Sequence, residues 1–400
     1  MRPKVIIAGA GPVGLLTALA LARQDVPVLV LEAEPELTRD LRAGTFHPPS
    51  LEMMAPLGVT EEMLRTAIRV PRWQIRDKRE GVIAEWDLSL LADVTPYPYR
   101  LHLEQHRLTP ILYRFLQAIP HAQVRFNHRV TGLTQSAGGV LVTAETPDGE
   151  ERFEGTWLVG ADGGRSTVRG AIGAGFEGFT WPERFVVVST PRDFAAHGYT
   201  PNAYVADPDE WAAIFKMPGT GPPGLWRMVF PVPPDEDEGL TLSEGMVERR
   251  VQSLRPAAER YPIEDKGIYK VHQRVARQFR AGRVLLAGDA AHVNNPLGAF
   301  GLNGGIHDAI NLADKLARVC RDGADASLLD RYVRQRRTVN LEYIQELSIR
   351  NLRRLSARDP EERRANFEEL RRVASTREGS REFLLASSMI ASVRRADAIP

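Results

Sequence analysis

The chain has 400 residues, enough for one large domain or two joined domains. Its 52 basic and 51 acidic residues leave a net charge of +1, which predicts no field that would attract nucleic acid or an anionic membrane. The single cysteine, Cys320, excludes an internal disulfide, and we interpret it as a buried structural thiol. No apolar run reaches the roughly 18 residues of a membrane span, and no signal-peptide pattern is present, so we expect a cytoplasmic, soluble protein.

A βαβ unit is predicted at the start of the chain. Residues 4–8 and 27–32 are short β-branched and leucine-rich runs typical of buried parallel strands, and 13–23 carries Leu and Ala at helical spacing. The first run leads into Gly9-Ala-Gly11-Pro12-Val13-Gly14, a G-x-G-x-x-G pattern. Between a strand and a helix, such glycines permit a tight turn, and the N–H groups that begin the helix can bind a pyrophosphate.

An acidic residue follows the second strand at the spacing that this pattern needs. Glu32 comes 18 residues after Gly14, and its carboxylate is placed to accept hydrogen bonds from an adenosine ribose, with Ala33 beside it. It also disfavours a 2′-phosphate, so FAD or NAD is expected rather than NADP. A glycine turn without a ligand is the alternative. Two further pattern matches, 173–178 and 219–224, are rejected because neither joins a strand to a helix.

The middle of the chain predicts a second sheet. Runs 185–189, 202–206, 212–217 and 225–232 are strand-like and are separated by Pro/Gly turns. We interpret 175–275 as a mostly antiparallel sheet inserted into a nucleotide-binding domain made of 1–174 and 276–325. The last part, 326–400, is predicted to be helical, with charges of both signs on solvated faces.

Two more motifs follow strand-like runs. The first is Gly160-Ala-Asp162-Gly163-Gly-Arg165-Ser166, after 156–160. The second begins with 283–288, ends in Gly288-Asp289, and continues through Asn295-Pro296-Leu-Gly298-Ala-Phe-Gly301-Leu302-Asn303 into a helix. Both place an acidic residue at the carboxyl end of a strand, where ligands bind in open α/β sheets.

With these three motifs in order, the chain resembles the class A FAD-dependent aromatic monooxygenases, the para-hydroxybenzoate hydroxylase-like family, over about residues 3–320. The resemblance implies an α/β fold with a Rossmann-like FAD-binding domain, the inserted sheet as substrate-binding domain, and C-terminal helices. It implies non-covalent FAD, NADPH or NADH as a transient co-substrate, O₂, and a small aromatic or phenolic substrate. Hydroxylation would proceed through a flavin C4a-hydroperoxide, whose distal oxygen an electron-rich ring attacks.

The motifs and the resemblance together define the expected FAD site. The Asp289 carboxylate can bond ribityl hydroxyls, and the helix after Pro296 can direct backbone N–H groups at the pyrimidine end of the flavin. By resemblance, Arg42, Gln105 and the main chain of Val130, in the strand-like run 123–130, contact FAD. Asp162 would lie near FAD and the NADPH path, or else be a turn or helix-cap residue. The expected FAD-binding residues are Gly9, Gly11, Pro12, Val13, Gly14, Glu32, Ala33, Arg42, Gln105, Val130, Asp162, Gly288, Asp289, Pro296, Gly298, Gly301, Leu302 and Asn303.

The substrate is expected between the flavin and the inserted sheet. By resemblance, the Pro296 carbonyl faces the substrate's phenol, and His47 is a polar neighbour; these are the two candidate catalytic residues. Many relatives have a proline where Asn295 stands, so an amide is expected near the ring. His292 is interpreted as structural, and no metal site is predicted. The candidate wall residues are Tyr204, Phe215, Trp226 and Phe230, of which strand alternation turns about half inward.

Rival functions are a flavin-dependent reductase or dehydrogenase, or a halogenase, on the same scaffold, and a flavin-fold carrier without chemistry. The tryptophan-rich signature of such halogenases is absent, and a carrier would not need the intact loop from Pro296 to Asn303. The sequence leaves open the substrate, the choice between NADH and NADPH, the group that deprotonates the substrate, and whether the protein is a monomer or a homodimer.

Overall fold

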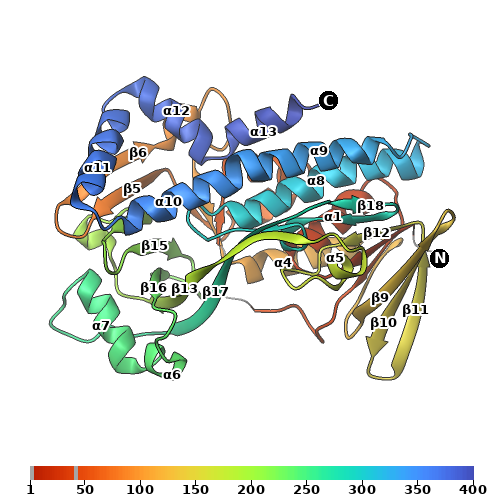
Figure 1. Cartoon of the computed structure of the whole chain (residues 1–400), viewed down its shortest axis with the longest axis horizontal. Coiled ribbons are helices and arrows are strands. Elements are labelled where there is room, and N and C mark those ends of the chain that lie inside the picture. Colours follow the sequence, from red (N-terminus) through yellow and green to blue (C-terminus); the bar gives the residue numbers. More distant parts are fainter. Residues whose placement is uncertain (1–3, 40–43) are drawn as a thin grey trace.

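The computed structural model describes residues 4–39 and 44–400. A six-stranded sheet forms one half of the molecule (Figure 1), and all its neighbouring strands are parallel except the edge pair β18–β19. Its four central strands are buried throughout, as strands covered on both faces require. The predicted Rossmann-like α/β fold is therefore confirmed. In spatial order the strands are β18 (Arg280–Ala281), β19 (Val284–Leu286), β12 (Trp157–Gly160), β1 (Val5–Ala8), β2 (Val28–Leu31) and β8 (Ala122–Arg125).

Helices cover this sheet. α1 (Pro12–Ala22), the predicted first helix, packs against α8 (Phe300–Arg321) and α4 (Gln105–Gln117). A small separate sheet consists of β3 (Thr45–Phe46), β7 (Arg100–His102) and β4 (Ile68–Val70). The short elements nearby are α2 (Pro48–Met54), η1 (Ala55–Leu57), α3 (Val59–Leu64), η2 (Leu88–Leu91), α5 (Thr167–Ala171) and η4 (Gly288–Ala290).

A three-stranded antiparallel sheet projects at the right of Figure 1. It consists of β9 (Arg129–Ser136), β10 (Gly139–Thr146) and β11 (Gly149–Gly155). The strand-like run predicted at 123–130 is divided between β8 and β9, because Asn127 adopts a left-handed conformation with φ of 58° and turns the chain.

The second large sheet has eight strands, antiparallel except where β14 meets β5. The predicted strands 202–206, 212–217 and 225–232 are found at those bounds. The sheet also takes β5 and β6 from the first part of the chain, so it extends beyond 175–275; the domain boundaries stay a prediction. In order the strands are β20 (His292–Val293), β17 (Asp265–Ala276), β13 (Phe176–Thr190), β16 (Leu225–Val232), β15 (Ala212–Met217), β14 (Asn202–Ala206), β5 (Arg72–Asp77) and β6 (Gly81–Asp87).

The two faces of the eight-stranded sheet have separate cores. One face, with Phe185 and Tyr204, packs against the C-terminal helices. The other face, with Trp226 and Phe230, packs against α7 (Glu244–Leu254), next to α6 (Glu238–Thr241) and η3 (Ala195–His197). Successive side chains of one strand therefore point alternately into these two cores.

The C-terminal region is helical, as predicted. α9 (Leu328–Val339) and α10 (Glu346–Ser356) form one rod, joined by a π-helical turn at Asn340–Gln345. α11 (Pro360–Ala374), α12 (Arg377–Ser387) and α13 (Ile390–Asp397) follow, and α11 lies over β6 at the upper left of Figure 1. No helix among the described residues is long and apolar enough to cross a membrane.

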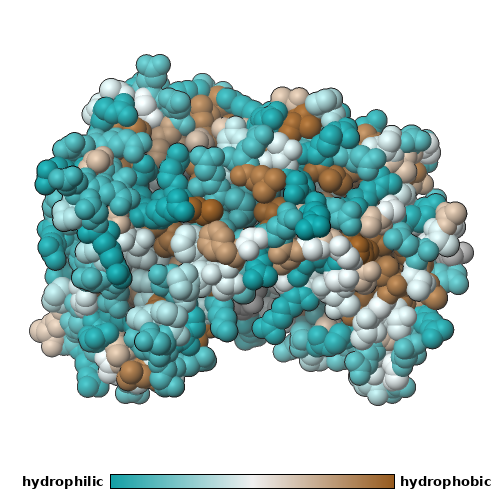
Figure 2. Space-filling model, viewed as in Figure 1, coloured by the Kyte–Doolittle hydropathy of each residue, from teal (hydrophilic) through white to brown (hydrophobic). Residues whose placement is uncertain are grey.

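The surface is mostly hydrophilic on the face drawn in Figure 2. Apolar residues there are scattered among polar ones, and the lower edge is hollowed between the lobe of α6 and α7 and the β9–β11 sheet.

Candidate functional site

The three sequence motifs meet at one edge of the six-stranded sheet. β1 lies between β2 and β12, and β12 pairs with β19, so the carboxyl ends of all four strands are adjacent. Backbone hydrogen bonds tie the segments that leave these ends: Gly9 N–H donates to the Leu31 carbonyl (2.8 Å), and Ala161 N–H donates to the Ala8 carbonyl (2.9 Å). This edge is where open α/β sheets bind ligands.

The glycine turn after β1 fits a pyrophosphate. A Cβ at Gly14 would lie 2.0 Å from the Gly9 carbonyl oxygen, so only glycine allows α1 to approach the turn. At Gly11, by contrast, a Cβ would meet no described atom within 4 Å. Gly11 is the N-cap of α1, without a side-chain cap, and Pro12 follows, so the first N–H groups of the helix are left for a ligand.

Glu32 braces the same turn. Its Oε2 accepts from Ala10 N–H (2.6 Å) and its Oε1 from Glu34 N–H (3.0 Å). Each carboxylate oxygen keeps a lone pair, so the predicted ribose contact is compatible with this bracing. Val130 is the second residue of β9 and is 8% exposed, while His128 N–H donates to the Glu32 carbonyl (2.7 Å).

Asp162 is engaged within its own loop. Its Oδ1 accepts from the Ser166 hydroxyl (2.5 Å), and its Oδ2 accepts from Val168 N–H (3.1 Å). Ser166 in turn caps α5. The contacts are those of the alternative expected for Asp162, a turn and helix-cap residue; a contact with FAD stays a prediction.

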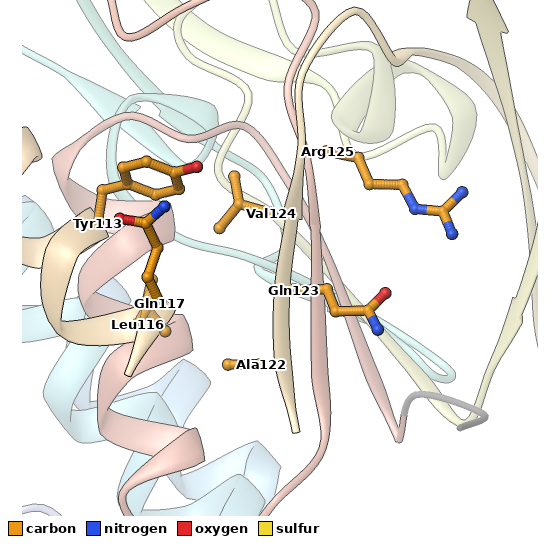
Figure 3. Close-up of a pocket in the computed structure, with 7 residues that line it drawn as sticks. All are labelled: Tyr113, Leu116, Gln117, Ala122, Gln123, Val124 and Arg125. Carbon is orange, nitrogen blue, oxygen red and sulfur yellow. The ribbon is translucent and has the colours of Figure 1, made fainter. Parts of the chain in front are cut away.

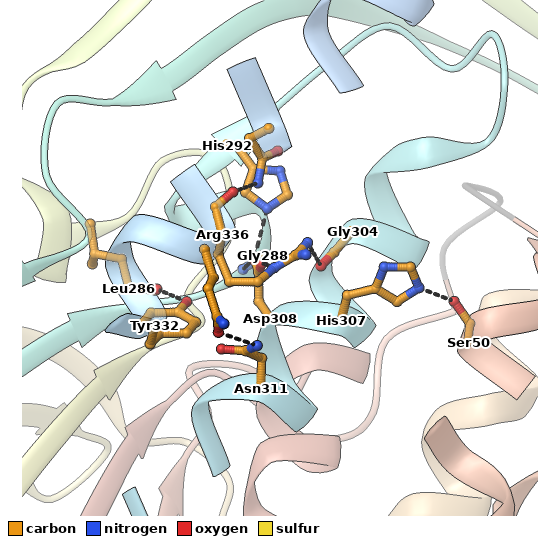
Figure 4. A network of polar contacts seen from close by, with 12 residues as sticks. Ser50, Leu286, Gly288, His292, Gly304, His307, Asp308, Asn311, Tyr332 and Arg336 are labelled. Atoms are coloured by element: carbon orange, nitrogen blue, oxygen red, sulfur yellow. Dashed lines mark hydrogen bonds and ion pairs between the residues drawn. The ribbon is translucent and has the colours of Figure 1, made fainter. Parts of the chain in front are cut away.

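Behind the third motif lies a buried ionic network that the sequence did not reveal (Figure 4). Asp308, on α8, accepts from Gly288 N–H (3.0 Å), and its carboxylate bonds His292 Nε2 (2.7 Å) and Arg336 Nε (2.6 Å). Tyr332 donates to the Leu286 carbonyl at 2.6 Å. The network fixes the turn that presents Asp289, and it gives His292 the structural role predicted for it.

The charge state of Asp308 follows from these partners. Burial alone would raise the pKa of its carboxyl, but the charges and hydrogen bonds of His292 and Arg336 outweigh burial and lower the pKa to about 2. Asp308 is therefore ionised at neutral pH, although it is wholly buried.

The loop after Pro296 leads into the N-terminus of α8. Ala299 is the N-cap, with φ of 58° and no side-chain cap, so the N–H groups of Phe300, Gly301 and Leu302 begin the helix without a cap. Asn303 holds this end in place: its Nδ2 donates to the Thr45 and Ala299 carbonyls (2.8 and 2.7 Å). Its side chain is bound by the protein, and a cofactor contact at Asn303 stays a prediction.

His47 is held in one tautomer. Its Nε2 donates to the Gly298 carbonyl (2.8 Å), which leaves Nδ1 as a hydrogen-bond acceptor that is buried and has no partner among the described residues. Its backbone N–H donates to Asn303 Oδ1 (2.8 Å). Burial, and then the charge of Arg100, lower the pKa of His47 to about 3, so the ring is neutral at neutral pH.

Asn295 and Pro296 form hydrogen bonds that hold the loop before α8 in place. Asn295 is fully buried; its backbone N–H and its Nδ2 donate to Gln273 Oε1 (3.1 and 3.2 Å), and its Oδ1 accepts from Leu297 N–H (3.0 Å). The Pro296 carbonyl accepts from Ala299 N–H (3.0 Å) and keeps one lone pair. A substrate contact at either residue stays a prediction.

A pocket with aromatic walls, here called the aromatic pocket, lies next to this loop. Tyr204 belongs to its wall, and its hydroxyl accepts from Gly298 N–H (2.8 Å), which ties the eight-stranded sheet to the loop before α8. α10 and α12 close the pocket from the other side. Its lining residues are Trp73, Arg100, Tyr204, Gly298, Phe300, Leu347, Arg350, Asn351, Phe383, Ala386 and Ser387.

Of the four predicted wall residues, Tyr204 lines the aromatic pocket and the other three are not among its lining residues. Phe215 lies on the same sheet face as Tyr204, with ring centroids 6.2 Å apart. Trp226 and Phe230 point into the opposite core; Trp226 donates to Asp193 Oδ1 (3.0 Å) and is 1% exposed. Strand alternation separates them, and sequence alone did not tell which face was which.

The remaining predicted residues are placed as follows. Arg42 lies outside the described residues. Gln105 is the first residue of α4, and Glu104 before it accepts from Gly219 N–H (2.7 Å). Cys320 lies in the last turn of α8 and is partly buried rather than fully buried as predicted; burial raises the pKa of its thiol to about 11, which suits a structural residue.

A second hollow lies apart from the motifs, between α4 and the edge strand β8 (Figure 3). It shares no lining residue with the three motifs or the aromatic pocket. Its lining residues are Tyr113, Leu116, Gln117, Ala122, Gln123, Val124 and Arg125.

Comparisons with known proteins match the chain to a family model and to curated relatives. Residues 2–346 match a family model described as an FAD binding domain. The chain is 37% identical to para-nitrophenol 4-monooxygenase of a Pseudomonas species over 388 residues, covering 95% of this chain and 94% of that protein. It is 35% identical to 6-hydroxy-3-succinoylpyridine 3-monooxygenase of Pseudomonas putida, covering 90% and 91%.

A solved structure shares the whole architecture. The crystal structure of p-nitrophenol 4-monooxygenase from Pseudomonas putida superimposes with a TM-score of 0.93 at 34% identity, covering 99% of this chain and 98% of that chain.

Proposed function

The chain belongs to the family of FAD-dependent aromatic monooxygenases, and on that premise we propose that it uses NADPH or NADH and O₂ to hydroxylate a small phenolic or related electron-rich ring. The observation that carries the proposal is the meeting of the glycine turn, Glu32 and the uncapped N-terminus of α8 at one sheet edge, beside the aromatic pocket. One oxygen atom of O₂ would enter the product, and the other would leave as water.

The residues present fit FAD held without a covalent bond. The open space at Gly11 and the uncapped start of α1 suit the pyrophosphate, and Glu32 suits the adenosine ribose. Asp289 would hold the ribityl chain, and the N-terminus of α8 would face the pyrimidine end of the flavin. When bound, FAD supplies the reductive activation of O₂.

A transient visit by NADPH or NADH is supported by a basic cluster next to the second motif. The pKa of His272 is lowered by burial and by the nearby charges of Arg274, Lys270 and Arg165. Positive charges gathered there suit the phosphates of a dinucleotide.

The chain's own groups would orient the substrate and keep it dry. His47, neutral at neutral pH, fixes the Gly298 carbonyl, and Tyr204 fixes the Gly298 N–H, so the peptide groups on both sides of the Gly298 Cα are held. With a pKa near 3, His47 is a poor base, and we assign it to positioning rather than to deprotonating the substrate. The walls Trp73, Phe300 and Phe383 would exclude water from the ring.

The substrate class is supported by two relatives. One is named for a nitrophenol and the other for a hydroxylated pyridine that carries a succinoyl group. Both are hydroxylated aromatic rings, and the aromatic pocket of this chain is lined by the rings of Trp73, Tyr204, Phe300 and Phe383.

The test is turnover with NAD(P)H under ¹⁸O₂ against a panel of phenols and hydroxypyridines, with mass spectrometry of the product. We expect one ¹⁸O atom in the product and FAD, not FMN, released by denaturation. A reduced or dehydrogenated product without new oxygen would overturn the proposal and favour the reductase or dehydrogenase alternative.

A further inference from the structure

Arg100 is a buried cation without a buried anion. It lies on β7, is 1% exposed, and its Nη1 donates to Asn202 Oδ1 (2.5 Å), while the guanidinium lies 4.4 Å from the centre of the Trp73 ring. Its Nε has no hydrogen-bond partner. No carboxylate in residues 4–39 or 44–400 forms an ion pair with it.

Two other arginines are equally buried, and both are neutralised. Arg250 pairs with Glu236 (2.9 Å) and Glu210 (3.0 Å), and Arg336 pairs with Asp308 (2.6 Å). Burial of an unpaired charge is costly, and proteins accept this cost mainly where a ligand or metal completes the pair. Arg100 therefore differs from Arg250 and Arg336 by lacking its counter-charge, and it lines the aromatic pocket.

The surroundings of Arg100 favour an anionic ligand. The lining of the aromatic pocket includes a second arginine, Arg350, and no Asp or Glu. Two further groups are buried without a partner among the described residues: Asn202 Nδ2, which is a donor, and the Ser387 hydroxyl, which lines the pocket. Burial lowers the pKa of Arg100 to about 10, so its side chain stays charged at neutral pH.

We infer that Arg100, held between Asn202 and Trp73, is a specificity-determining residue that binds a negatively charged group of the substrate, a phenolate or a carboxylate on an aromatic ring. The inference rests on the proposed function for the reaction, but it concerns binding. The charged oxygen would accept from the guanidinium, and the ring would contact the aromatic lining of the pocket, where Trp73 and Phe383 stack with ring centroids 5.7 Å apart. A substrate bound as phenolate would also have the more electron-rich ring.

The test measures equilibrium binding to the FAD-loaded protein by quenching of tryptophan fluorescence, without turnover. Two pairs of probes differ in charge and little in shape: 4-hydroxybenzoate against its methyl ester, and 4-nitrophenol at mildly alkaline pH against 4-nitroanisole. In R100Q we expect the affinity for the anion of at least one pair to fall by about 10- to 100-fold, as loss of a charged hydrogen bond implies. The neutral partner should bind almost unchanged.

Two further variants, R100K and R353Q, are controls for this binding experiment. R100K should recover part of the affinity, because it restores the charge without the planar fork. R353Q removes the same charge from an exposed position on α10 outside the pocket, and it should bind both probes of each pair as the wild type does. The pair that responds to R100Q tells whether a carboxylate or a phenolate is recognised.

Equal losses for charged and neutral probes in R100Q, or no loss at all, would overturn the inference. Failure of the proposed function would look different: protein without FAD, or product without ¹⁸O. A yellow protein that hydroxylates phenols but binds anions equally well with and without Arg100 would refute this inference alone.

Discussion

The cofactor edge and the aromatic pocket differ in how their charged side chains are compensated. At the cofactor edge, Glu32, Asp162 and Asp308 all have protein partners, and the helices α1 and α8 begin there without a side-chain cap. Around the aromatic pocket, side-chain atoms of Arg100, His47 and Asn202 are buried without partners among the described residues. Backbone N–H groups suit a cofactor that is the same throughout the family. Unpaired side chains suit a substrate that differs from one relative to another.

The largest expected effect separates two glycines of the cofactor edge. Gly14→Val places side-chain atoms on the Gly9 carbonyl oxygen, 2.0 Å from where Cβ must lie, so we expect a protein that fails to fold or collects in aggregates. Gly11→Val points into open space and should fold normally but lose FAD. Circular dichroism and the flavin absorbance of the purified variants check both. A yellow Gly11→Val protein would contradict the pyrophosphate site.

The next effect tests the buried ionic network behind the cofactor edge. Arg336→Met removes a charge that Asp308 needs, and the buried carboxylate then lacks half of its compensation. We expect the free energy of unfolding to fall by about 3–5 kcal/mol, measured by urea denaturation. Arg395→Met, which breaks the exposed pair with Glu342, is the control and should cost less than about 1 kcal/mol.

Acid should reveal the same network in the wild type. Because the folded pKa of Asp308 is lowered to about 2, its contribution to stability is complete above the ordinary value near 4 and is lost as pH falls toward 2. The expected loss from this carboxyl is about 2 kcal/mol over that window. Asp308→Asn should flatten this part of the stability–pH curve; an unchanged slope would show that other carboxyls control acid unfolding.

The smallest expected effect concerns Tyr204, which lines the aromatic pocket. Tyr204→Phe leaves the buried Gly298 N–H without its acceptor and should cost about 1–2 kcal/mol of stability. It should also release more H₂O₂ per NAD(P)H consumed, because the loop next to the ring is less fixed. Tyr261→Phe breaks a comparable bond on the opposite sheet face, to the Arg255 carbonyl, and should leave the peroxide yield unchanged. Equal peroxide yields in the two variants would deny Tyr204 this role.

The difference between the two regions also explains what sequence could predict. The glycine turn, Glu32 and the loop from Pro296 to Asn303 are local patterns with a local cause, and the structure brings them together as expected. Arg100, Asn202 and Phe383 have no such pattern, since they come from β7, β14 and α12 and meet only in three dimensions. The prediction that Trp226 is a wall residue is wrong. The two-residue period of a strand shows which side chains share a face, but it does not show which face meets the pocket.

The closure of the aromatic pocket by α10 and α12 has a consequence for biosynthesis. All strands of the six-stranded sheet, together with α1 and α8, are complete by Arg321, whereas pocket residues continue to Ser387. On the ribosome, the six-stranded sheet can therefore assemble with α1 and α8 while the segment that closes the pocket is still untranslated. A ribosome stalled after α9, which supplies Tyr332 and Arg336, and before α12 would carry a nascent chain with this sheet and its buried network complete and the aromatic pocket open on one side.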